Sequence, residues 1–206
     1  ILYGLGVEEA VAVANSDSVI FVNCDLVGPR GSSDLLSVQE GASGLLAVGS
    51  RIYVFGSEIT AGASNEPSGN GVPGVDVIGG ELVLRNSSAR GGSGGFGGLT
   101  PAGNGGPGVR VWGAGIVTSL DSVLTGGGGG FDPLFGNHGD AGPPYLVEWG
   151  ELVELSSDSV SLVTPRLTSV EPHGATVQLD VEAVAGSPCW LLASMDAIPV
   201  LSLIHI

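Results

Sequence analysis

The chain has 206 residues, with 21 acidic residues against 6 arginines and no lysine, and a formal net charge of −15. This acidity argues against nucleic-acid binding, which needs clustered basic side chains, and against anionic membrane surfaces. Hydrophobic residues make up 43% of the sequence, so a core can form despite 37 glycines and 12 prolines, and a disordered chain is excluded.

Five related segments organise most of the chain. Two neighbours, residues 44–62 and 74–92, align at an offset of 30 residues, and residues 74–92 and 108–126 align without a gap at an offset of 34. Each unit has a short strand, a glycine turn, a second strand, an Asn, Asp or Ser corner and a third short strand. Short β-rich runs separated by glycine predict strands, and no segment keeps a helical period beyond about two turns. The full set is residues 19–28, 44–62, 74–92, 108–126 and 145–163.

Glycine-rich tails follow the repeats at the same point of each unit, at residues 91–107 and 126–142. Their insertions and deletions predict loops that protrude from one side of a repetitive structure. The glycines keep no strict period of three along the chain, which excludes a collagen-like fibre. Because glycine loses the most entropy on ordering, we expect residues 91–107 to be mobile unless something packs on them.

Three short strands joined by tight bends, repeated every 30–37 residues, predict one coil of a solenoid per repeat and about five coils. The fold class predicted is all-β. Two motifs, G-V-D-V-I-G-G-E-L-V-L at residues 74–84 and S-V-L-T-G-G at residues 122–127, and the glycine-rich tails resemble right-handed parallel β-helix repeats. This pectate-lyase-like superfold includes the large glycine-rich surface proteins of environmental bacteria. The resemblance implies a bacterial protein that is secreted or on the cell surface, and it leaves function open, because lyases, glycosidases, adhesins and passive stalks share the fold.

The predicted domains are a β-solenoid at residues 1–165 and a strand-rich segment at residues 166–200. Residues 176–180 alternate as a half-buried antiparallel strand does, which predicts the start of a small β-sandwich that caps the solenoid. The last six residues, L-S-L-I-H-I, are the translation of the DNA string CTG-TCT-CTT-ATA-CAC-ATC, which resembles a sequencing-library adapter. We therefore expect residues 201–206 to be adapter read-through and the chain to be a metagenomic fragment of a longer gene. No apolar run reaches the length of about 18 residues that spans a bilayer.

No catalytic residue is predicted. The superfold's lyases hold calcium with clustered acids and use a Lys or Arg base, whereas this chain has no lysine and its arginines form no evident set with acids. Asp76, Asp121 and Asp158 occur once per coil, and they could stack on one face as a hydrolase site. The other interpretation, a turn-forming Asp that bonds its own backbone, is favoured.

One motif could bind calcium. Residues 127–135, G-G-G-G-F-D-P-L-F, match the nonapeptide of calcium-binding repeats and would place the ion at Asp132, with Asp140 as a further ligand. Such sites share each ion between tandem copies, and one copy is present, so a plain glycine-rich turn is the alternative. His138 is expected to face solvent, and Cys24 and Cys189 are expected to act as small apolar residues.

Trp112 and Trp149 each precede a glycine turn in their repeats. They could form a stacking platform for sugar rings or fill corners of the core. The sequence thus predicts a non-catalytic extracellular or cell-surface protein, structural or adhesin-like, whose partners are polysaccharide or other envelope components. The alternative is a non-catalytic slice of a carbohydrate-active β-helix enzyme, a polysaccharide lyase or glycoside hydrolase.

Overall fold

The computed structural model describes residues 9–31, 41–97 and 100–156 in full, together with the backbones of short strands elsewhere in the chain. Strands make up 46% of the chain, and the described residues contain no helix. The chain divides into two compact units, residues 1–156 and 157–206, which are described separately below.

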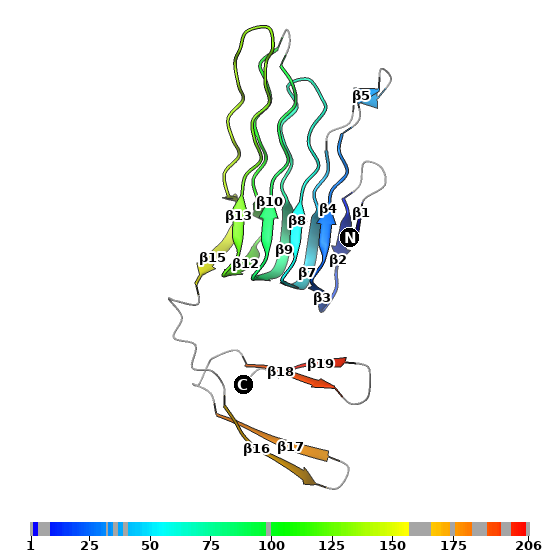
Figure 1. Ribbon diagram of the computed structural model, residues 1–206, viewed down its shortest axis with the longest axis vertical. Helices are drawn as coiled ribbons and strands as arrows, with labels where there is room; N and C mark the ends of the chain where they lie inside the picture. The colour runs from blue at the N-terminus through cyan, green and yellow to red at the C-terminus, as the bar shows by residue number, and fades with distance from the viewer. Residues whose placement is uncertain are drawn as a thin grey trace. The chain divides into compact units, whose positions relative to one another are not determined.

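The first unit is a parallel β-solenoid of about four turns, shown edge-on in Figure 1. The predicted all-β parallel β-helix is therefore confirmed. The number of complete coils is about four instead of five, because the last repeat contributes two described strands and no third. In chain order the coils contain β2 (Val11–Ala14), β3 (Val19–Val22) and β4 (Asp25–Val27); β7 (Leu45–Phe55) and β8 (Glu58–Thr60); β9 (Val75–Arg85) and β10 (Ser88–Arg90); β11 (Val109–Trp112), β12 (Gly115–Leu120) and β13 (Val123–Thr125); and the incomplete β14 (Tyr145–Val147) and β15 (Gly150–Leu155).

Two parallel sheets form the walls of the solenoid. The smaller has the order β1-β4-β8-β10-β13, where β1 is Leu2–Tyr3, and the larger joins the remaining strands of the coils. Equivalent residues of successive coils stand in rows, so that Val75 pairs with Leu45 on one side and with Val109 on the other. Stacking of this kind needs a whole coil between parallel neighbours, which matches the spacing of the sequence repeats.

The core is a column of aliphatic side chains between the two sheets. The middle residue of each three-residue strand of the smaller sheet points inward, because side chains alternate along a strand. These residues are Leu26, Ile59, Ala89 and Leu124, and each is at most 9% exposed. They pack with fully buried residues of the larger sheet, among them Val75, Val77, Leu82, Leu84, Val109, Val111 and Val117.

One corner of the solenoid is built from a stacked serine ladder. The residue that turns the chain there has a positive φ in each coil, and it is Asn23, Gly56, Asn86 or Asp121, types that tolerate this conformation. The next residue is Cys24 in the first coil and a serine in the following three, Ser57, Ser87 and Ser122, of which Ser57 and Ser87 are buried. Ser87 Oγ donates to Arg85 O at 2.8 Å and accepts the N–H of Ser57 at 3.2 Å, and Ser122 Oγ accepts the N–H of Ser87 at 3.1 Å. The ladder thus satisfies buried backbone groups from coil to coil. Asp121 lies at a turn, as expected, whereas Asp76 lies inside strand β9 and bonds Arg110, so the turn-forming interpretation is wrong for Asp76; Asp158 lies outside the described residues.

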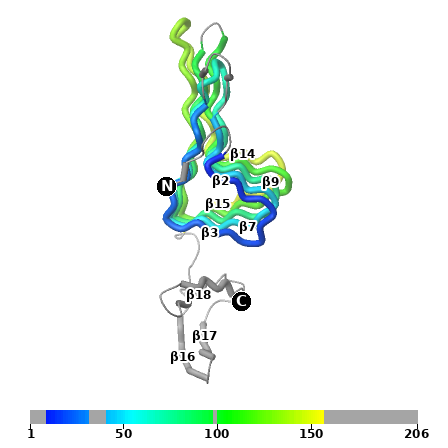
Figure 2. The backbone as a smooth tube through the Cα atoms, turned by 90° about the vertical axis from the view of Figure 1, so that its right-hand side faces the viewer, coloured from blue at the N-terminus to red at the C-terminus, as the bar shows by residue number. Residues whose placement is uncertain are grey.

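The glycine-rich loops extend from one side of the solenoid as a narrow stack, shown in Figure 2. Each loop has two limbs that lie side by side: an outgoing limb that leads away from the solenoid and a returning limb that leads back to it. Hydrogen bonds recur at every third residue: the N–H groups of Gly91, Gly94 and Gly97 donate to the carbonyls of Thr125, Gly128 and Phe131 in the next loop. Bonds between outgoing and returning limbs have the same period, as in Gly103 to Gly95 and Gly106 to Gly92. A three-residue repeat is that of the polyproline II helix, so we call this assembly the loop bundle (residues 28–31, 41–44, 61–74, 91–97, 100–108 and 126–144).

Glycine is required where the limbs of the loop bundle touch. A Cβ atom at Gly127 would overlap the carbonyl oxygen of Gly92, and one at Gly95 would overlap that of Glu66. As at the axis of collagen, only a residue without a side chain allows backbones to approach this closely. Neighbouring loops therefore pack on the described parts of residues 91–107, so the condition under which we expected mobility is not met. The period of three is local to the limbs, which is why the whole chain shows no strict repeat.

The remaining strands are antiparallel pairs. In the second unit β16 pairs with β17 and β18 pairs with β19, and β5 pairs with β6 in the first unit. The predicted strand at residues 176–180 lies within β17. The β-sandwich, the domain boundary at residue 165 and the origin of residues 201–206 stay predictions. The bounds are β5 (Ser33–Asp34), β6 (Ser37–Val38), β16 (Arg166–His173), β17 (Thr176–Glu182), β18 (Cys189–Ser194) and β19 (Pro199–Ile204).

Candidate functional site

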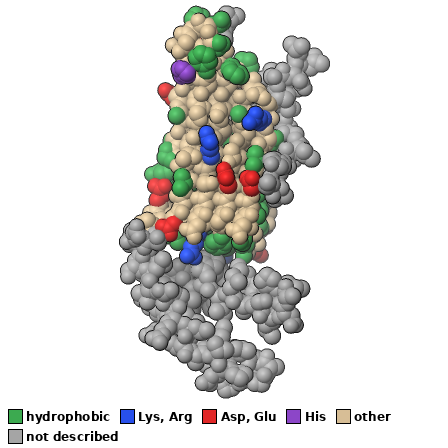
Figure 3. Space-filling model, in the orientation of Figure 1, with side chains coloured by type: hydrophobic (Ala, Val, Ile, Leu, Met, Phe, Trp, Pro, Cys, Tyr) green, Lys and Arg blue, Asp and Glu red, His purple; other side chains and the backbone are tan. Residues whose placement is uncertain are grey.

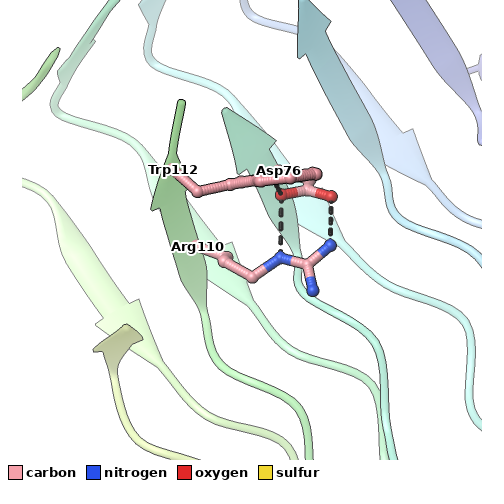
Figure 4. Close-up of polar contacts among 3 residues, drawn as sticks. All are labelled: Asp76, Arg110 and Trp112. Atoms are coloured by element: carbon pink, nitrogen blue, oxygen red, sulfur yellow. Dashed lines mark hydrogen bonds and ion pairs between the residues drawn. The ribbon is translucent and has the colours of Figure 1, made fainter. Parts of the chain in front are cut away.

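An ion pair and a tryptophan lie together on the larger sheet, shown in Figure 4. Asp76 of β9 and Arg110 of β11 are partners in the parallel ladder. Arg110 Nε lies 3.0 Å from Asp76 Oδ1 and Nη2 lies 2.5 Å from Oδ2, the two-pronged geometry that suits a guanidinium and a carboxylate. Trp112, two residues further along β11, donates from its indole Nε1 to Asp76 Oδ1 at 3.2 Å.

Burial and charge hold this cluster in place. Asp76 is 7% exposed, and the Arg110 side chain is 33% exposed. The hydrogen bonds to Asp76 raise the pKa of Arg110, burial opposes them, and the charges of Asp76 and Glu148 add to the rise. The guanidinium is therefore charged at all working pH values. Its Cζ lies 5.6 Å from the centre of the Trp112 ring, within the range of a cation–π contact. Asp76 and Arg110 thus both contact the indole of Trp112.

Trp112 and Trp149 both lie outside the buried core, at 38% and 72% exposure. They do not share a row of the sheet, because Val111 pairs with Val147 and this register puts Glu148 opposite Trp112. Trp149 follows one position later, where its carbonyl accepts the N–H of Ala114 at 3.0 Å. The two tryptophans therefore belong to adjacent coils near the same turn. Glu148 lies directly opposite Trp112, and Trp149 is the residue that follows Glu148.

The carboxylate of Asp132 is buried and hydrogen-bonded within its own turn. The residue is 1% exposed, and its Oδ1 accepts the N–H groups of Leu134 at 2.9 Å and Phe135 at 3.2 Å. This is the local turn that Asp favours. Asp140 is exposed, and its N–H donates to Asn104 Oδ1 at 2.8 Å. Among the described residues there is no group of three or more His, Cys, Asp or Glu side chains able to hold a metal, and calcium at Asp132 and Asp140 stays a prediction.

The end of the loop bundle is apolar. Figure 3 shows hydrophobic side chains gathered there beside a histidine. Phe96, Leu134 and Phe135 are 63%, 65% and 66% exposed, and the rings of Phe131 and His138 lie 4.9 Å apart. His138 is exposed, as expected. The Asp132 turn fixes the backbone that carries Leu134 and Phe135, so these side chains are presented outward from a bonded loop.

A polar groove of about 410 Å³ lies at another corner of the solenoid. It contains a second ion pair, with Arg51 Nε 3.0 Å from Glu81 Oε2. The two side chains are 55% and 41% exposed, so water screens this pair more than the first. The groove is open, and the residues that line it are Ser16, Asp17, Gly49, Ser50, Arg51, Gly80 and Glu81.

Both ion pairs contradict the expectation that the arginines form no set with acids. The signal was present in the aligned repeats. Asp76 and Arg110 occupy the same position in segments offset by 34 residues, and Arg51 and Glu81 do so in segments offset by 30. Residues at equal positions in stacked coils are neighbours, so the alignment predicts each contact directly.

Comparisons with protein-family models, with curated proteins and with solved structures find no match for this chain. Within the part of the chain that the structure describes, no helix has the length and apolar character needed to cross a membrane.

Proposed function

We propose that the chain belongs to a non-catalytic, extracellular or cell-surface protein of bacterial origin that acts as an adhesin and contacts polysaccharide through Trp112 and Trp149. The proposal includes the right-handed, pectate-lyase-like form of the parallel β-helix, which the repeat motifs resemble. The observation that carries it is a tryptophan held on the outer surface by an ion pair. An indole that served only to fill the core would be buried, whereas Trp112 is 38% exposed.

The chemistry around the two indoles suits a sugar. A flat apolar ring can pack against the C–H groups of a pyranose, and neighbouring polar groups can bond its hydroxyls. Arg110 and Glu148 supply such groups beside Trp112. Because the chain carries a net charge of −15, a neutral or cationic polysaccharide is favoured over an acidic one.

The architecture supports a surface role. Stacked coils make a long, repetitive wall, and such walls offer extended contact surfaces to partners. The loop bundle adds a projection whose end exposes Phe96, Leu134 and Phe135. A projection of this kind places contact groups away from the solenoid body, which is the arrangement that an adhesin needs.

The test is affinity electrophoresis of the whole chain in gels that contain soluble neutral β-glucan, chitosan or alginate. We expect retardation by the neutral or the cationic polymer and none by alginate. Trp149→Ala should weaken this binding about tenfold, the effect of losing roughly 1.4 kcal/mol of contact. Phe131→Ala, which removes an exposed aromatic from the loop bundle, is the matched control and should bind normally. Absence of retardation in all three polymers, or retardation that Trp149→Ala and Trp112→Phe both leave unchanged, would refute the sugar site.

A further inference from the structure

The outermost loop of the bundle, residues 126–144, differs from the loops beneath it in one respect. In each earlier outgoing limb, backbone N–H groups at every third residue donate to the next loop. Gly28 and Gly31 bond to Thr60 and Ala63, then Ala61 and Ser64 bond to Arg90 and Ser93, then Gly91 and Gly94 bond to Thr125 and Gly128. The register therefore defines which groups of the last loop should donate to a further layer.

Those groups belong to Gly126, Gly129 and Ala141. Arg90 pairs with Thr125, so Gly126 and Gly129 stand where Gly91 and Gly94 stand in the layer below. In the returning limb Gly105 donates to Asp140, and Ala141 follows at the equivalent place. No acceptor for these three N–H groups exists among the described residues. The edge of the bundle thus resembles the edge strand of a sheet, with a row of donors ready to pair.

The layers already present show what would cover this edge. Each limb is covered by another extended limb that offers a carbonyl at every third residue. The covering limb also needs glycine where it crosses its neighbour, because a Cβ at Gly92 would overlap Gly62 O and a Cβ at Gly127 would overlap Gly92 O. The same interface repeats through the bundle, so the next occupant must obey the same two rules.

We propose that the outer edge of the loop bundle, formed by Gly126, Gly129 and Ala141, binds an extended polyproline II-type segment with glycine at every third residue, such as a glycine-rich loop of a neighbouring chain. In strand addition, a peptide binds by extending the edge of a β-sheet. Here the peptide would extend a bundle of polyproline II-type limbs, which have three residues per turn. Main-chain hydrogen bonds provide the attraction, and the steric demand for glycine provides the selectivity. The site does not include Trp112 or Trp149, so a test of peptide binding at this edge is independent of the proposed sugar binding.

The experiment uses the full chain labelled with ¹⁵N and a synthetic peptide with the sequence of residues 89–98, added to millimolar concentration. We expect downfield shifts of the Gly126, Gly129 and Ala141 amides and slower hydrogen exchange, by about tenfold when the free peptide is near nine times its Kd. The control peptide carries alanine at the positions of Gly92 and Gly95 and should leave the three amides unchanged.

A variant of the chain itself provides a second test of the edge. Ala141→Pro removes one donor, and proline suits the extended limb, so the fold should survive while peptide binding weakens several-fold. Three results would overturn the proposal: protection of the three amides in the free chain, no perturbation by the glycine peptide, or equal binding of the alanine peptide. Broadening of these same amides as the chain alone is concentrated would support it, with a second copy as the source of the segment.

Discussion

Two adjacent glycines of the loop bundle give a sharp test of why the loops are ordered. Gly127 and Gly128 lie in the same run, and neither has a positive φ, so backbone strain does not distinguish them. A Cβ at Gly127 would overlap the carbonyl oxygen of Gly92. A Cβ at Gly128 would meet nothing nearer than Ser93 Oγ at 3.9 Å. Alanine should therefore be rejected at the first position and accepted at the second.

The cost at Gly127 follows from its hydrogen bonds. Its N–H donates to Gly106 O at 2.8 Å, and its carbonyl accepts the N–H of Gly142 at 2.9 Å. Moving the limb to admit a methyl group weakens both, and each is worth about 1 kcal/mol net. Alanine returns about 0.7 kcal/mol by restricting the unfolded chain. We expect Gly127→Ala to destabilise the bundle by about 1–2 kcal/mol and Gly128→Ala to stabilise it by up to about 1 kcal/mol.

Amide hydrogen exchange in the native state measures this difference locally. Protection of the amides of residue 127 and Gly142, the donors of these two bonds, should fall about tenfold or more in Gly127→Ala, since 1.4 kcal/mol corresponds to a factor of ten, and should hold or rise in Gly128→Ala. The urea midpoint of the solenoid unit should move in the same directions. If the two variants were equally stable and equally protected, close packing of the limbs would not be the source of order in the loops.

Three further outcomes follow from the solenoid. Asp76→Ala leaves the half-buried guanidinium of Arg110 unpaired and should lower the free energy of unfolding by about 2 kcal/mol, whereas Arg51→Ala, at an exposed pair, should change it by less than about 0.5 kcal/mol in urea titrations. Ser87→Ala removes the acceptor of a buried N–H and should cost about 1–2 kcal/mol by the same measurement. Burial, and then the charge of a nearby glutamate, raise the pKa of Tyr53. The folded state therefore disfavours the phenolate, and stability should fall as pH rises above about 10, less so in Tyr53→Phe.

The coils were predictable because their signal is local and repeated. Glycine turns, short aliphatic strands and a constant offset between segments define a parallel stack without any knowledge of a partner. The same offset also encodes the pairs Asp76–Arg110 and Arg51–Glu81. Judged singly along the chain, these charges look unrelated. The stacked register, and not the sequence distance, decides which side chains meet.

The order of the glycine-rich loops was not predictable from residue preferences. A single loop of this composition gains nothing that would offset the entropy of fixing its glycines. Its stabilisation comes from loops about 34 residues away, through bonds such as Gly94 to Gly128. A sequence signal exists in the local spacing of three between buried glycines, as in Gly103 and Gly106 or Gly127 and Gly130. It carries meaning only when several such segments recur at the period of the coils.

The sheet and the loop bundle share one register, and this continuity explains how loops of unequal length can pack. Strand β10 pairs with β13 up to Arg90 and Thr125, and the next bond in line, from Gly91 to Thr125, already belongs to the bundle. The backbone thus changes from a β-strand, with a period of two residues, to an extended limb, with a period of three residues, and it stays hydrogen-bonded to the same neighbouring coil. Because the limbs are fixed from their base outward, differences in length collect at the far end, where the Asp132 turn closes the longest loop. Insertions at that end should therefore be tolerated, while a single insertion within a limb would shift every glycine beyond it out of contact.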